Sequence, residues 1–117
     1  MIKSAGDLIA EAQARISTVD VAAAHELFTG AAGNALIIDV READSAAESK
    51  LADSVNISRG LLEMKVGKHC TEADRLILTH CAGGGRASLA AQTLQDMGYT
   101  NVHAITARFE DIKSVFG

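Results

Sequence analysis

The chain has 117 residues, of which 48% are hydrophobic and 22% are charged, as is usual for a single folded domain with one core. Its formal net charge of −4 lacks the basic excess that binding to nucleic acid or to an anionic membrane surface requires. No apolar run is long enough to span a bilayer or to form the core of a signal peptide. The two cysteines are too few for a secreted disulfide framework, so we expect a cytoplasmic protein.

The first thirty residues predict two helices. Ser4 followed by Asp7 forms a capping pattern for the first helix, which has apolar residues at helical spacing. Ser17 and Asp20 repeat that pattern before a second helix over residues 21–30, which ends at a glycine. The first helix is expected to pack on the core of the protein.

Short apolar runs then alternate with helical patterns. Strands are predicted over residues 35–40, 75–80 and 101–105, with a further candidate at 53–58. Helices are predicted over residues 43–50, from Arg86 to Gly98, and over 108–116. This alternation predicts an α/β fold with a mainly parallel central sheet and helices on both faces. We expect residues 16–117 to form the domain and residues 1–15 to be a helical extension of it.

The loop that follows residues 75–80 has the composition of a reactive site. It reads Cys81, Ala82, Gly83, Gly84, Gly85 and Arg86. It leaves the carboxyl end of a predicted strand, where open parallel sheets bind ligands. Three glycines let backbone N–H groups turn inward, and the helix N-terminus behind them favours an anion. The loop therefore predicts a nucleophilic thiolate in an anion-sized cradle, the alternative being a buried structural cysteine before a flexible turn.

Three segments resemble a known family. "IIDVRE", residues 37–42, is followed by "CAGGGRASLAAQTLQDMGYTNV", residues 81–102, and both resemble single-domain rhodaneses, whose loop has the form Cys-x-x-Gly-x-Arg. "VNISRGLLEMKV", residues 55–66, resembles the segment that follows the second family motif. The resemblance extends over roughly residues 16–112 and implies a rhodanese-like fold.

The resemblance also implies a reaction, the transfer of sulfane sulfur from thiosulfate or a similar donor to cyanide or a thiol. Cys81 would carry the sulfur as a persulfide, and the backbone amides from Ala82 to Arg86 would hold the sulfur or the donor's sulfonate. Arg59 would bind the donor anion, while Asp39 and Arg41 would stabilise the structure of the sheet edge that carries the cysteine loop. The implied partners are a small sulfur-containing anion and a thiol or protein acceptor, with no metal or cofactor.

The chain departs from the family pattern at two places. Ser45-Ala46 and "SKLADS", residues 49–54, stand where rhodaneses have Glu-aromatic and Gly-His-Ile-Pro-Gly-Ala. Ala107 and Arg108 replace paired glycines, and the tryptophan that usually follows them is absent. These changes affect the rim of the pocket and therefore the choice of donor.

Other functions fit the loop less well. Cysteine phosphatases and arsenate reductases place five residues between cysteine and arginine, whereas four lie between Cys81 and Arg86. A persulfide carrier or binding module without turnover is the main alternative. Replacing Gly84 with valine is expected to block the cradle without much loss of stability.

The pairs His69-Cys70 and His80-Cys81 suggest a zinc site. Neighbouring strand residues point to opposite faces, however, so His80 and Cys81 are not expected to share a metal. His80 is expected to pack away from the thiol rather than to act as its base. Cys70 is either a surface thiol or a partner that resolves the persulfide as a disulfide, and the sequence does not choose between these roles.

Overall fold

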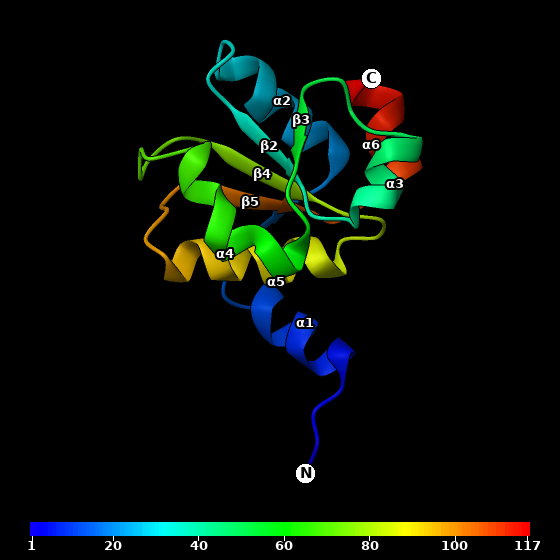
Figure 1. Cartoon of the computed structure of the whole chain (residues 1–117), viewed down its shortest axis with the longest axis vertical. Helices are drawn as coiled ribbons and strands as arrows, with labels where there is room; N and C mark the ends of the chain where they lie inside the picture. The colour runs from blue at the N-terminus through cyan, green and yellow to red at the C-terminus, as the bar shows by residue number, and fades with distance from the viewer.

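The computed structural model describes residues 1–117 and contains a five-stranded parallel sheet between two helical layers (Figure 1). The strands are β1 (Ser17–Val19), β2 (Leu36–Asp39), β3 (Ser54–Asn56), β4 (Ile77–His80) and β5 (Val102–Ile105). Their order across the sheet is β1-β5-β4-β2-β3, and every pairing is parallel. The predicted α/β fold with a parallel sheet is confirmed.

The helices are α1 (Ala5–Gln13), α2 (Val21–Gly30), α3 (Ala43–Glu48), α4 (Leu62–Lys65), α5 (Gly85–Asp96) and α6 (Phe109–Phe116). The predicted capping box of α1 is present, since Ser4 and Asp7 bond to each other's backbone N–H. Asp20 caps α2 by accepting the N–H of Ala23 at 2.8 Å. None of these helices has the length and apolar character needed to cross a membrane.

Four short elements were not predicted. Ser17 lies in β1, which pairs with β5 at the edge of the sheet, and only Asp20 caps the following helix. Residues 59–68 form two 3-10 turns, Arg59–Leu61 and Val66–Lys68, on either side of α4. These elements are three or four residues long, so none of them can show a hydrophobic period.

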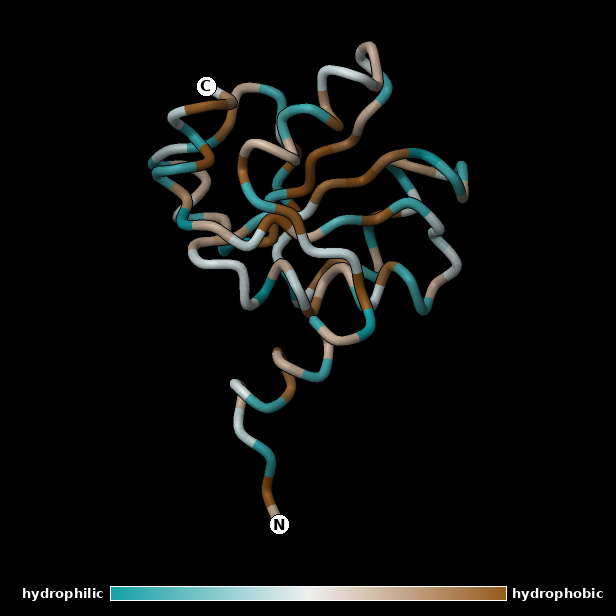
Figure 2. The backbone as a smooth tube through the Cα atoms, turned by 180° about the vertical axis from the view of Figure 1, so that it is seen from behind, coloured by the Kyte–Doolittle hydropathy of each residue, from teal (hydrophilic) through white to brown (hydrophobic).

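The sheet is buried on both faces. All four residues of β2 and of β4 are buried, and along β2 they alternate between the two layers. Ile38 packs with α4 and α5, whereas Ile37 packs with α2 and α6. Figure 2 shows the hydrophobic stretches of the chain running through these central strands. Both cores therefore hold the carboxyl end of β4 in a fixed position.

Helix α1 lies outside these layers, against α5 (Figure 1). Its Ala12 is fully buried. The side chain of Gln13 donates a hydrogen bond to Ser88 Oγ at 3.1 Å, and Gln95 donates to the carbonyl of Arg15 at 3.1 Å. Helix α1 thus runs along the helix that begins at the cysteine loop.

Candidate active site

The thiol of Cys81 lies at the carboxyl end of β4, at the start of the loop that leads into α5. Cys81 is only 2% exposed. Its Sγ accepts hydrogen bonds from the backbone N–H of Gly84 at 3.1 Å and of Ala87 at 3.3 Å. Backbone donors aimed at sulfur stabilise negative charge on it, as does the helix N-terminus from which Ala87 comes. The geometry therefore suits a nucleophilic sulfur.

The loop around this sulfur contains unpaired donors. The N–H groups of Ala82, Gly83, Gly85 and Arg86 have no hydrogen-bond acceptor within the protein. Ala82 and Gly83 are exposed to solvent, so this side of the loop is open. Free N–H groups beside a helix N-terminus are suited to an anion that approaches the sulfur from solvent.

Gly84 turns the loop into α5. Its φ of +100° is in the left-handed region, which disfavours any residue with a Cβ. A Cβ at this position would also lie 3.0 Å from Cα of Thr106. The expectation that valine here would leave stability largely intact is therefore wrong, because both strain and backbone contact oppose it.

The two arginines expected to bind substrate lie differently. Arg86 is at the rim, with 40% of its side chain exposed and Nη1 3.6 Å from a carboxylate oxygen of Glu42. Arg59 donates to Glu63 at 3.1 Å and to Thr93 at 2.8 Å, and Thr93 lies two turns into α5. The structure brings Arg86 to the cysteine loop and places the guanidinium of Arg59 along α5 instead.

Asp39, the last residue of β2, and Arg41 form a buried ion pair. Arg41 donates to both carboxylate oxygens of Asp39, with the shortest contact 2.8 Å, and to the carbonyl of Ser49 at 2.6 Å. Burial raises the pKa of Asp39, but the hydrogen bonds and charge of Arg41 outweigh it and lower that pKa below its ordinary value. The guanidinium carbon lies 3.9 Å from the ring centre of Phe109. These contacts join β2 to α3 and α6.

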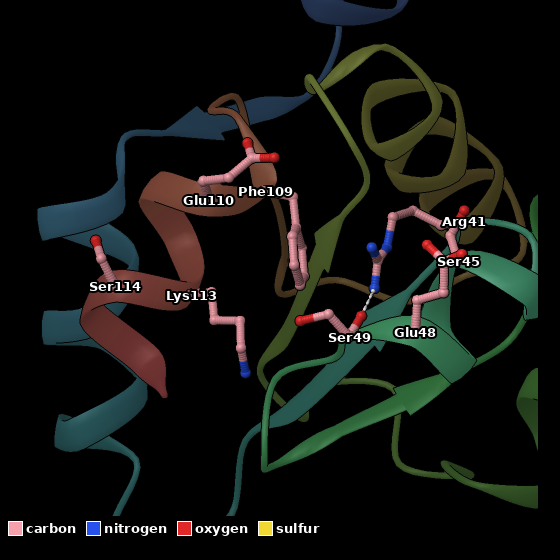
Figure 3. A pocket seen from close by; sticks show the side chains of 8 residues that line it. All are labelled: Arg41, Ser45, Glu48, Ser49, Phe109, Glu110, Lys113 and Ser114. Atoms are coloured by element: carbon pink, nitrogen blue, oxygen red, sulfur yellow. Dashed lines mark hydrogen bonds between the residues drawn. The ribbon is translucent and has the colours of Figure 1, made fainter.

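A cleft of about 550 Å³ opens beside this ion pair, between α3 and α6 (Figure 3). Its lining consists of Arg41, Ser45, Glu48, Ser49, Phe109, Glu110, Lys113 and Ser114. Phe109 links the cleft to the active loop, because its N–H donates to the carbonyl of Ala82 at 3.1 Å. Phe109 was not predicted from the sequence, because a backbone contact between residues 82 and 109 leaves no local sequence pattern.

His80 faces away from the thiol, as expected. It is fully buried and stacks on Phe109 with ring centres 5.9 Å apart. Burial lowers the pKa of His80, an effect that the nearby Asp39 carboxylate only partly offsets. Neither ring nitrogen has a hydrogen-bond partner. No group of three or more His, Cys, Asp or Glu side chains is placed to hold a metal ion.

Cys70 lies at the opposite end of α5 from Cys81. Its carbonyl accepts the Tyr99 hydroxyl at 2.6 Å, beyond the C-terminus of the helix. The twelve residues of α5 span about 18 Å at 1.5 Å per residue. A disulfide requires Cα atoms within about 7 Å, so Cys70 does not resolve a Cys81 persulfide in this fold. It is also buried rather than a surface thiol.

A parallel α/β domain with a cysteine at a strand-to-helix loop, its sulfur bonded by two backbone N–H groups, defines a class of proteins with a cysteine-based site. Within that class, this chain belongs to the rhodanese-like domain family, whose model matches residues 20–114. The match leaves out α1. No curated protein matches the sequence.

Solved structures agree with this assignment. A protein of unknown function from Rhodopseudomonas palustris, described as a possible tyrosine phosphatase, is 28% identical with a TM-score of 0.82, over 100% of this chain and 94% of that one. A rhodanese-related protein from Thermoplasma volcanium is 23% identical, with a TM-score of 0.68 over 84% and 91% of the two chains. The human single-domain sulfurtransferase TSTD1 is 22% identical, with a TM-score of 0.68 over 80% and 92%. The last two show a shared fold.

Proposed function

We propose that the protein is a sulfurtransferase that carries sulfane sulfur on Cys81. The observation that carries this proposal is the contact of Cys81 Sγ with the N–H groups of Gly84 and Ala87 at 3.1 and 3.3 Å. The free N–H groups of the same loop supply donors for a sulfur or sulfonate anion. Membership of the rhodanese-like family supports sulfur transfer as the type of reaction.

Thiosulfate serves as the donor in the simplest form of the reaction. The Cys81 thiolate attacks the outer sulfur of thiosulfate, the sulfur–sulfur bond of the donor breaks, and sulfite leaves with the bonding electron pair. Cys81 then carries a persulfide, whose terminal sulfur is negatively charged and lies among the loop amides. An acceptor such as cyanide attacks that sulfur, forms thiocyanate and restores the thiolate.

The backbone amides and the side chains around the loop have different roles in this proposal. The amides of Ala82, Gly83, Gly85 and Arg86 bind the transferred sulfur and the leaving sulfite, and the Arg86 guanidinium adds charge at the rim. Asp39 and Arg41 hold the end of β2 and do not touch the reacting sulfur. Arg59 reaches the donor only after releasing Thr93 and Glu63. The proposed partners are a small sulfur-containing anion as donor and a thiol or a protein as sulfur acceptor.

Two alternatives are tested beside this function. The first is a persulfide carrier or binding module of the same fold that does not turn over thiosulfate. The second is phosphatase activity, which the description of the Rhodopseudomonas palustris protein raises. Only four residues separate Cys81 from Arg86, and the guanidinium of Arg86 faces Glu42, so the loop offers a tetrahedral phosphate a smaller ring of donors.

The deciding experiment is the intact mass of the protein after incubation with thiosulfate and again after cyanide. We expect wild type and Cys70→Ser to gain one sulfur and lose it as thiocyanate appears, and Cys81→Ser to gain none. Loading on Cys81→Ser would contradict the nucleophile. Absence of loading from thiosulfate, with loading from a persulfidated protein, would favour the carrier. Hydrolysis of p-nitrophenyl phosphate that depends on Cys81 would favour the phosphatase.

A further inference from the structure

Helix α1 lies outside the residues that match the family and contacts the first turn of α5 at two points. The first is Ile9, whose Cδ1 lies 2.8 Å from the place that a Cβ at Gly85 would occupy. Gly85 therefore leaves the space into which Ile9 packs. The first residue of α5 is thus held from outside by a side chain of the N-terminal extension.

The second point is a chain of hydrogen bonds. Gln13 Nε2 donates to Ser88 Oγ at 3.1 Å, and the Ser88 hydroxyl donates to the carbonyl oxygen of Gly84 at 2.7 Å. Ser88 is fully buried, and its own N–H donates to the same carbonyl at 3.0 Å. Because Gln13 occupies a lone pair of the Ser88 oxygen, the hydroxyl hydrogen is left to point toward Gly84.

The Gly84 carbonyl belongs to the peptide unit whose N–H is that of Gly85. That N–H has no acceptor within the protein and is one of the free donors beside Cys81. A carbonyl that accepts two hydrogen bonds polarises its peptide, and the N–H of that peptide becomes a stronger donor. Both contacts of α1 therefore act on one peptide of the anion cradle.

We propose that Ile9 and Gln13 are positioning residues that orient and polarise the Gly84–Gly85 peptide, and so strengthen anion binding beside Cys81. Gln13 acts through Ser88, and Ile9 acts by fixing the backbone of Gly85. The proposal deepens the sulfurtransferase function and rests on it for the identity of the natural anion. The preference of the loop for an anion can also be measured without sulfur transfer.

Two alkylating reagents separate anion recognition from thiol reactivity. Iodoacetate and iodoacetamide have similar size and both alkylate Cys81, but only iodoacetate is an anion. We therefore compare the rate constants for the two reagents. Each reaction is followed by the mass of the peptide that carries Cys81, so that Cys70 does not contribute to the signal. The ratio of the two rate constants reports the preference of the cradle for an anion.

The test variant is Gln13→Met, which keeps the length of the side chain and removes its donor. The matched control is Gln95→Met, because Gln95 also joins the two helices, through the carbonyl of Arg15, but at the far end of α5. We expect Gln13→Met to lower the iodoacetate-to-iodoacetamide ratio by about two- to fivefold, the range of a weakened hydrogen bond. Gln95→Met should leave the ratio at the wild-type value.

Three further results decide the proposal. Ser88→Ala should lower the ratio as Gln13→Met does, and the double variant should lower it no further, because the two residues act in series. If Gln13→Met and Gln95→Met change the ratio equally, or neither changes it, α1 merely stabilises the fold and the proposal is overturned. If wild type does not load sulfur, sulfur transfer fails while the alkylation ratios still decide the role of α1.

Discussion

His80 is a fully buried imidazole with no hydrogen-bond partner at either ring nitrogen. Its charged neighbours are Asp39 and Arg41, and these are bonded to each other. Burial lowers the pKa of His80 in the folded protein, so the unfolded chain binds a proton more readily. The contribution of His80 to stability is therefore complete above its unfolded pKa of about 6.5 and decreases as the pH falls below that value.

The prediction is that His80→Leu removes part of the acid sensitivity of the protein. At pH 7.5 we expect the free energy of unfolding in urea to stay within about 1 kcal/mol of wild type, because no hydrogen bond is lost and the volume is similar. At pH 5 the variant should have lost less stability than wild type. His103, whose burial also lowers its pKa, is present in both proteins and cancels in the comparison. Parallel pH profiles would show that the buried imidazole does not titrate with unfolding.

Some residues of the candidate site were predictable from local sequence patterns, and others were not. Cys81 and its glycines were identifiable because a cysteine followed by glycines at a strand end is a local pattern. Arg59 was placed near the donor by resemblance to the family, but its contacts with Glu63 and Thr93 depend on how α4 packs against α5. The contacts of Ile9 and Gln13 join segments more than seventy residues apart, and no local pattern encodes them.

At the scale of elements, the start of α5 packs against the turn that follows β5. Gly84 makes this approach possible, since a Cβ at this position would lie only 3.0 Å from Cα of Thr106. We predict that Gly84→Ala lowers the free energy of unfolding in urea by about 2–4 kcal/mol, through left-handed strain and a backbone clash. Retention of wild-type stability would contradict the assigned conformation.

Gly33 provides the matched control for that prediction. Its φ of +88° is also left-handed, but no atom lies within 4 Å of the place of its Cβ. Gly33→Ala therefore introduces strain alone, which costs about 1–2 kcal/mol. A loss at Gly84 that equals the loss at Gly33 would mean that contact with Thr106 does not limit this position.

The elements that were predicted well from the sequence have either a side-chain cap or a recognisable apolar run. Helices α1 and α2 carry caps, and β2 and β4 are apolar runs buried on both faces. The three residues of β1 are mostly exposed, so burial leaves no pattern in their sequence. Their place in the sheet comes from pairing with β5, a contact across eighty-six residues between Ser17 and His103. Strand order likewise depends on the tertiary structure and was left open.

At the scale of the whole molecule, net charge and local site act in opposite directions on an anionic donor. The chain carries a formal charge of −4, which repels thiosulfate at long range. In the proposed reaction, the free amides and Arg86 would attract thiosulfate only near the loop, within reach of hydrogen bonds. Since salt screens distant charges more than close ones, ionic strength separates the two effects.

The prediction is that sulfur loading from thiosulfate becomes faster as salt is added. Between about 10 and 150 mM NaCl the Debye length shortens from about 30 to about 8 Å, so most of the long-range repulsion disappears. We expect the second-order rate constant for loading, measured by intact mass at timed intervals, to rise about two- to fivefold. Alkylation of Cys81 by neutral iodoacetamide is the control and should not change. A loading rate that falls with salt would mean that Arg86 and the start of α5 attract the donor from a distance, despite the negative charge of the rest of the protein.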